Sequence, residues 1–274
     1  MAQYGEISSI DRINRNSLLE IAAHQTVRIP PLTISLNHPH PRMNSFDATI
    51  QLFITRHAFA SSATNHAIEA LTRLYLAKGL LLVFVLWWIW FQPVEGNNQR
   101  REIVVATFAA GLISLFVGRL LAYLLPFRLR PYLDPTLHLH FPVSMSSDAA
   151  LRTWSSFPSD HAMLWAAIAL GIFLIWRRVG VIALAYTALF ICAPRVYVGL
   201  HYPTDVIAGA LLGVAITYLL TRAPIRAVFA KPILRLFELY PGPCYALGFM
   251  FCFELVTQFD EIRIIAHFLV KTYS

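Results

Sequence analysis

Six blocks of apolar residues alternate with short polar breaks along most of the chain. They cover residues 74–91, 103–125, 162–176, 179–193, 206–220 and 240–256. A helix needs roughly 20 mostly apolar residues to cross the hydrocarbon core of a bilayer, with about 17 to 25 tolerated. The shorter blocks reach this length once flanking residues are included. Six such blocks in succession predict an all-α integral membrane protein rather than a soluble protein with buried helices.

The residues before the first block are polar and mixed. They include the proline-rich stretch IPPLTISLNHPHPR, which is typical of an extended linker. Residues 46–60, FDATIQLFITRHAFA, are too polar to be assigned as a span and could cross, re-enter or lie at the interface. We therefore expect an N-terminal arm over 1–45, a transmembrane core over 46–222, and a C-terminal extension over 223–274 with a further hydrophobic helix.

Composition agrees with a membrane protein. The 274 residues are 57% hydrophobic and only 14% charged, whereas soluble domains are about a quarter charged. The formal net charge of +7 does not require nucleic acid as a partner, because the basic residues gather in alternate breaks. By the positive-inside tendency those breaks are cytoplasmic and face membrane lipids. They contain Arg100, Arg101, Arg177, Arg178, Arg222, Arg226, Lys231 and Arg235.

The remaining breaks, residues 126–160 and 194–205, then face outward and are rich in reactive side chains. They carry Arg128, Arg130, Ser159, Asp160, His161, Arg195, His201 and Asp205. Arginine offers a rigid fork of donors that matches phosphate oxygens, and the unpaired N–H groups at the start of a helix bind anions. We expect these residues to converge on one pocket for a phosphate group.

Two histidines supply the chemistry that phosphoryl transfer needs. His201 and Asp205 are four residues apart, so on a helical turn they share a face and can hydrogen-bond. An aspartate placed there suits a histidine that acts as nucleophile or base. His161 then supplies a proton to the leaving oxygen.

Each of these residues also has a structural interpretation. Ser159 or Asp160 could simply cap a helix, Arg195 could extend to lipid headgroups, and His201 with Asp205 could form an interfacial pair without chemistry. The sequence HLH at 138–140 has no matching partners, so no metal site and no cofactor is predicted.

The stretches PSDH and RVYVGLHYPTD resemble the type 2 phosphatidic acid phosphatase (PAP2) superfamily, with its motifs KxxxxxxRP, PSGH and SRxxxxxHxxxD. The matching residues are Arg130 and Pro131, then Pro158, Ser159 and His161, then Arg195, His201 and Asp205. The resemblance implies a six-helix membrane bundle and a metal-independent phosphatase. It implies that His201 attacks phosphorus, oriented by Asp205, and that His161 protonates the leaving group. It assigns the phosphoryl oxygens to Arg130, Arg195 and Ser159.

Three positions depart from these motifs: Tyr123 replaces the lysine, Pro194 the serine and Asp160 the glycine. Our hypothesis is that Arg119, one helical turn before Tyr123, or Arg128 supplies the missing cation; alternatively, Arg119 reaches headgroups or pairs within the bundle. Asp160 could stabilise the helix start or position an arginine.

The PSDH variant is similar to bacterial members of the family that hydrolyse undecaprenyl diphosphate. That lipid in the bacterial inner membrane, cleaved on the extracytoplasmic side, is the leading substrate. Phosphatidate, phosphatidylglycerol phosphate and lipid A phosphate are alternatives. The alternative functions are a lipid phosphotransferase that uses the same phosphohistidine and a non-catalytic lipid-binding protein.

Overall fold

A computed structural model describes residues 43–58, 61–93, 97–137, 139, 141, 153–260, 262 and 268. Within these residues every regular element is a helix, which confirms the all-α prediction. His138 and His140 lie outside them, as does most of the N-terminal arm. The elements are α2 (Ser45–Ala58), α3 (Ser62–Arg73), η1 (Leu76–Leu80), α4 (Leu81–Trp90), α5 (Asn97–Leu124), η2 (Pro131–Leu133), η3 (Pro135–Leu137), α7 (Asp160–Ile175), α8 (Arg177–Tyr186), η4 (Thr187–Cys192), α9 (Ala193–Tyr197), α10 (Pro203–Leu220), α11 (Ala223–Leu239) and α12 (Pro241–Thr257).

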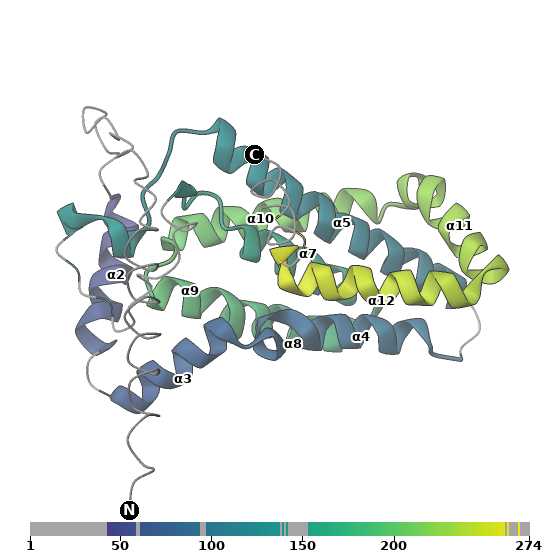
Figure 1. Ribbon diagram of the computed structural model, residues 1–274, viewed down its shortest axis with the longest axis horizontal. Coiled ribbons are helices and arrows are strands. Elements are labelled where there is room, and N and C mark those ends of the chain that lie inside the picture. The colour runs from purple at the N-terminus through teal and green to yellow at the C-terminus, as the bar shows by residue number, and fades with distance from the viewer. Residues whose placement is uncertain are drawn as a thin grey trace, which may run out of the picture. The chain divides into compact units, whose positions relative to one another are not determined.

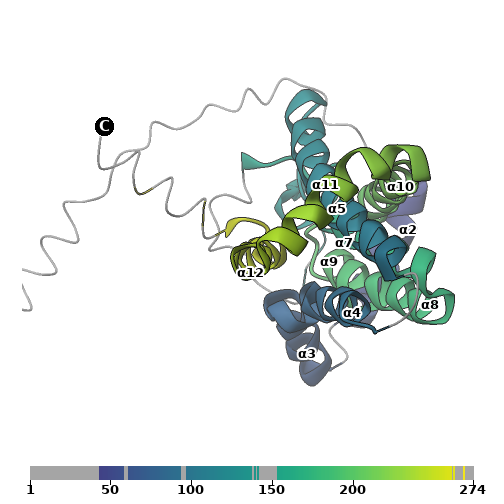
Figure 2. The same ribbon diagram turned by 90° about the vertical axis from the view of Figure 1, so that its right-hand side faces the viewer.

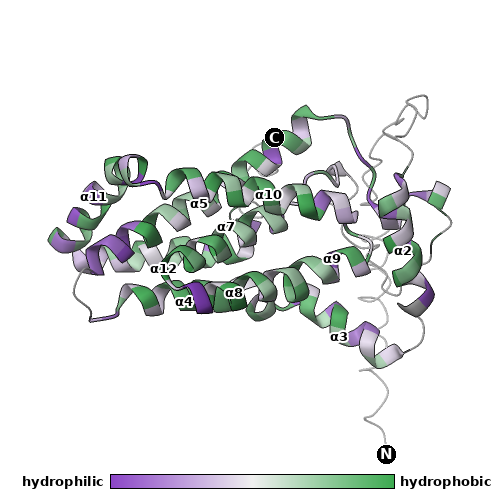
Figure 3. Ribbon diagram, turned by 180° about the vertical axis from the view of Figure 1, so that it is seen from behind, coloured by the Kyte–Doolittle hydropathy of each residue, from purple (hydrophilic) through white to green (hydrophobic). Residues whose placement is uncertain are grey.

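Three helical segments are long and apolar enough to cross a membrane. They are α5, the continuous run from α8 to α9, and α10. The pair formed by α3 and the run from η1 to α4 is bent by 59° and counts as a fourth span if it crosses as one unit. In Figure 3 the helix bodies are mostly hydrophobic, and hydrophilic residues gather around α11 at one end and α2 and α3 at the other.

The helix α7 occupies the centre of the bundle, with α5, α10, α8 and α4 around it (Figures 1 and 2). Every residue from Ala162 to Ala169 is buried, so lipid does not contact this part of the helix. Glycines allow its neighbours to approach closely. A Cβ atom at Gly209 would lie 2.5 Å from the Ser159 carbonyl oxygen, and one at Gly213 would lie 2.1 Å from the Met163 carbonyl oxygen. The crossing of α7 and α10 is therefore a contact of backbones.

A kink before α4 serves the same packing. Gly79 has a φ of +149°, a conformation that side chains with a Cβ rarely adopt. The indole ring of Trp165, which is fully buried on α7, occupies the space where a Cβ at Gly79 would project. The bend in the chain between α3 and α4 thus accommodates the largest side chain of the central helix.

Residues 46–60, for which the sequence did not decide between crossing the membrane and lying at its interface, form most of α2. Its 14 residues extend about 21 Å at 1.5 Å per residue, short of the roughly 30 Å hydrocarbon core, and it is not among the candidate spans. Figure 1 shows α2 across one end of the bundle, and α2 contacts α9 and α10 there. This places α2 against the segment that carries His201 and Asp205.

Candidate active site

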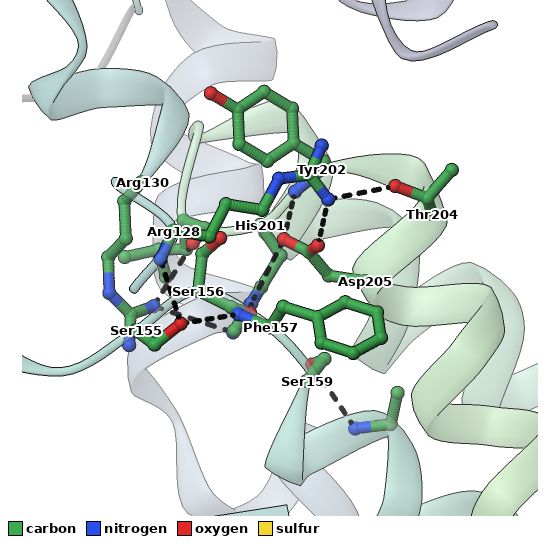
Figure 4. Close-up of polar contacts among 12 residues, drawn as sticks. Arg128, Arg130, Ser155, Ser156, Phe157, Ser159, His201, Tyr202, Thr204 and Asp205 are labelled. Carbon is green, nitrogen blue, oxygen red and sulfur yellow. Dashed lines mark hydrogen bonds and ion pairs between the residues drawn. The ribbon is translucent and has the colours of Figure 1, made fainter. Parts of the chain in front are cut away.

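The predicted site residues come from helix ends that meet at one end of the bundle. Arg195 lies in α9, and His201 follows it after a turn at Gly199, where φ is +74°. The Leu200 and His201 N–H groups donate to the Arg195 carbonyl oxygen, at 2.9 and 3.3 Å. Asp205 lies in the first turn of α10 (Figure 4). The turn therefore holds Arg195, His201 and Asp205 in one short, tightly bonded loop.

The contacts of His201 determine which of its nitrogens is available. Its Nδ1 lies 2.8 Å from the Ser156 carbonyl oxygen, which can only accept, so Nδ1 carries the proton and Nε2 keeps a lone pair. That Nε2 lies 3.5 Å from Nη1 of Arg130, and Nη1 also donates to the Leu200 carbonyl oxygen at 3.0 Å. Burial and then the charge of Arg130 lower the pKa of His201 well below its ordinary value. The ring is neutral at pH 7, as a nucleophile must be.

Asp205 does not contact His201 as predicted. Its Oδ2 is 3.9 Å from His201 Nδ1, which is too long for a hydrogen bond, and Oδ2 accepts the Tyr202 N–H at 2.9 Å instead. The reason is geometric: the Ser156 carbonyl oxygen already occupies the only direction in which Nδ1–H can donate. Asp205 therefore supports His201 by charge and through the loop.

Arg128 differs from the expectation that it binds phosphate. Its guanidinium group pairs with Asp205 and with Asp47, the latter at 2.8 Å, and donates to the Thr204 hydroxyl at 3.0 Å. It also lies over the Tyr202 ring, 3.9 Å from the centroid. Figure 4 shows it between the ring and the carboxylate of Asp205. Nη1 and Nη2 both donate to the protein, so Arg128 is less suited than Arg119 to replace the missing lysine.

Asp160, whose role the sequence left open, contacts the second histidine. Its Oδ1 accepts the His161 backbone N–H at 2.7 Å and lies 2.9 Å from His161 Nδ1. With Nδ1 held by the carboxylate, Nε2 is the nitrogen that can exchange a proton. Both histidines thus have Nδ1 fixed by an oxygen acceptor, one by a carbonyl group and one by a carboxylate.

A small pocket brings four of the predicted residues together: Arg119, Arg130, Asp160 and His201. Its complete lining is Gly118, Arg119, Ala122, Arg130, Trp154, Ser155, Pro158, Asp160 and His201. Arg119 lies over Trp154 and donates to the Gln258 carbonyl oxygen at 2.8 Å. Tyr123, which stands where the motif has lysine, is 86% exposed and does not line this pocket.

Two further predicted phosphate ligands are buried beside the pocket. Arg195 is 8% exposed, and its Nε has no hydrogen-bond partner in the part of the chain that is described. Ser159 is fully buried, and its hydroxyl oxygen accepts the Ala162 N–H at 3.4 Å as the cap of α7. The helix cap considered for Ser159 is thus present.

Sequence reasoning missed the residues that hold the site from outside. Ser156 acts through its carbonyl group, which every residue type has, so its identity carries no signal. Asp47 and Gln51 are polar and fully buried on α2. Their segment was set aside as too polar to span the membrane; that polarity was the available signal.

Comparison with known proteins agrees with the motifs. Residues 102–228 match the PAP2 superfamily, a range that contains all ten predicted site residues. The putative undecaprenyl-diphosphatase YbjG of Escherichia coli (strain K12) is 32% identical over 145 residues, which cover 51% of this chain and 66% of that protein. The undecaprenyl-diphosphatase BcrC of Bacillus subtilis (strain 168) is 27% identical over 196 residues, 71% of this chain and 84% of BcrC.

A third relative carries a different name. The bacitracin transport permease protein BcrC of Bacillus licheniformis is 28% identical over 165 residues, 60% of this chain and 74% of that protein. No solved structure matches the chain. The region that carries the site, residues 102–228, is thus similar to the PAP2 superfamily. The protein is a phosphatase, with helices suited to a membrane.

Proposed function

We propose that the protein hydrolyses undecaprenyl diphosphate to the monophosphate and inorganic phosphate. The names of the two undecaprenyl-diphosphatase relatives support this substrate. The observation that carries the chemistry is the state of His201: its Nδ1–H is held by the Ser156 carbonyl oxygen, and its free Nε2 lies 3.5 Å from Arg130. A lone pair beside a fixed cation is what attack on a phosphoryl group requires.

The reaction proceeds in two displacements at the terminal phosphorus. In the first, His201 Nε2 forms a bond to phosphorus, the bond from phosphorus to the bridging oxygen breaks, and His161 gives that oxygen a proton. In the second, the oxygen of a water molecule forms a bond to phosphorus, His161 takes a proton from that water, and the bond from phosphorus to His201 Nε2 breaks to release inorganic phosphate. Arg130, Arg195 and Ser159 hold the oxygens whose charge rises in the transition state.

We assign the cation that replaces the missing lysine to Arg119. It lines the same pocket as His201 and Arg130, whereas Arg128 is engaged with two carboxylates. Its contacts with the Trp154 ring and the Gln258 carbonyl oxygen hold the guanidinium group in place at this pocket. A guanidinium group placed there matches the oxygens of a phosphate.

We further propose six membrane crossings, with the site on the extracytoplasmic side. They are the bent pair α3 and α4, then α5, α7, α8 to α9, α10 and α12. Helix α2 is too short to cross, so we take α12 as the sixth crossing, although the sequence predicted it as an extra helix outside the six-helix core. Helix α7 has 16 residues, fewer than a lipid-facing span needs, but it is surrounded by other helices. The basic breaks next to α5, α8 and α11 lie at the end of the bundle opposite the site (Figure 1).

The test is phosphate release from purified protein in detergent with chelator present. Undecaprenyl diphosphate, phosphatidate, phosphatidylglycerol phosphate and lipid A are compared as substrates for the wild type and for His201→Ala. We expect preferred release from the diphosphate and a loss of at least about 10³-fold in the variant. Equal release by both proteins would refute the mechanism, preference for another lipid would refute the substrate, and a phosphorylated acceptor with little free phosphate would identify a phosphotransferase.

A further inference from the structure

Helix α2 contacts the segment that carries the proposed nucleophile, although it precedes the region that matches the family. Asp47 and Gln51 lie one turn apart on α2, and both are fully buried. The Gln51 amide donates to the His201 carbonyl oxygen at 3.4 Å. A buried helix face with an acid and an amide is costly unless its polar groups are paired, and here they pair with the loop from His201 to Asp205.

The Asp47 carboxylate binds the first turn of α10. Its Oδ1 accepts the Thr204 N–H at 2.9 Å, and its Oδ2 accepts the Thr204 hydroxyl at 2.7 Å. The Thr204 N–H belongs to the first turn of α10, where N–H groups lack partners within the helix. Asp47 thus caps α10 from another helix, and its negative charge is favourable at the positive end of the α10 dipole.

The same carboxylate reaches Asp205 through Arg128. Arg128 Nη2 donates to Asp47 Oδ2 at 2.8 Å, while Nη1 contacts the carboxylate of Asp205. A planar guanidinium group held by two carboxylates has one orientation, whereas a guanidinium group held by one can rotate. Asp47 therefore determines how Arg128 presents its second edge to Asp205.

We propose that Asp47 is a positioning residue for phosphoryl transfer: through Arg128 and Thr204 it holds Asp205 and the start of α10 in place beside His201. This rests on the proposed function in taking His201 as the nucleophile. Asp47 does not touch the reacting atoms. It acts by positioning the groups that touch the reacting atoms, and their positions affect the chemical step more than substrate binding. Helix α2 thus belongs to the catalytic apparatus.

The test is a double-mutant cycle on phosphate release, using whichever lipid phosphate the wild type hydrolyses. We expect Asp47→Asn to lower kcat by about 10- to 100-fold with KM within about threefold, because a 1 Å misplacement costs up to about 10²-fold. In an Asp205→Asn background the same substitution is expected to change kcat by less than about threefold, since the group it positions is already altered. A purely structural role would lower kcat equally in both backgrounds.

The matched control is Glu69→Gln, which removes the charge of an acid paired with Arg73 on α3, away from the network. It is expected to leave kcat unchanged. If Asp47→Asn does not fold, Arg128→Lys keeps the charge but cannot bridge two carboxylates, and the same loss is expected. An Asp47→Asn or Arg128→Lys protein with full kcat, or equal losses in both backgrounds, would overturn the proposal. Failure of the proposed function would show instead as a wild type that releases no phosphate, or as release independent of His201.

Discussion

The close crossing of α7 and α10 makes Gly213→Ala a demanding test of the site geometry. Gly213 lies in α10, two helical turns after Asp205, and contacts neither histidine. The added methyl group would be 2.1 Å from the Met163 carbonyl oxygen and 2.9 Å from its carbonyl carbon. Both obstacles are backbone atoms of the central helix, so no side-chain rotation can relieve the overlap.

The size of the effect follows from these distances. Carbon and carbonyl oxygen approach to about 3.3 Å in close helix contacts, so the two helices must separate by roughly 1 Å. Overpacking of this kind costs about 1–3 kcal/mol of stability. Because α7 carries His161 and α10 carries Asp205, the separation also shifts the groups of the site relative to each other. A misplacement of about 1 Å can cost up to 10²-fold in rate, and we expect kcat to fall by about 10- to 100-fold.

The assay is phosphate release in detergent together with the apparent midpoint of thermal unfolding. The midpoint is expected to fall by about 2–4 °C for each kcal/mol. The control is Gly242→Ala in α12, where an added Cβ has no atom within 4 Å, and both quantities should stay at the wild-type values. A Gly213→Ala protein with wild-type kcat and midpoint would refute the argument that backbone contact between α7 and α10 sets the site.

Four further predictions concern residues of the site. Because the pKa of His201 is lowered in the folded protein, the neutral ring persists below pH 6.5: kcat/KM should not fall with an apparent pKa near 6.5, and such a fall would contradict the assignment. As the pH falls, His201 takes up a proton near pH 6.5 in the unfolded chain but only at lower pH in the folded protein. The contribution of His201 to stability is therefore present above about pH 6.5 and is lost as the pH falls. Unfolding midpoints measured between pH 7.5 and 5.5 will test this. Arg119→Ala should lower kcat/KM by about 10- to 100-fold, because it removes a charged contact with phosphate. Arg119→Lys should recover part of that loss. Wild-type kinetics in the alanine variant would exclude Arg119 as the replacement cation. Asp160→Asn weakens the acceptor for His161 Nδ1 and should lower kcat by about tenfold with little change in KM. An unchanged kcat would show that Asp160 only stabilises the start of the helix.

The helical class and the motif residues were predictable because they depend on local rules. A bilayer requires about 20 apolar residues for each crossing, so the blocks of the sequence reveal α5 and α10 directly. The spacing of Arg195, His201 and Asp205 was legible for a similar reason: one tight turn and the start of one helix carry all three. The sequence predicted α7 as a short membrane span, and it did not show that other helices surround this helix.

The partners of each polar side chain were decided only by the tertiary structure. From spacing alone Asp205 was expected to hydrogen-bond to His201, yet the Ser156 carbonyl oxygen, 45 residues earlier, occupies that position. Arg128 looked free to bind phosphate, but it is engaged by Asp47, a residue 81 positions away. Periodicity and motif spacing report which residues share a helix or a turn. Which donor meets which acceptor depends on how separate helices cross, and the glycine contacts between α7 and α10 set that crossing.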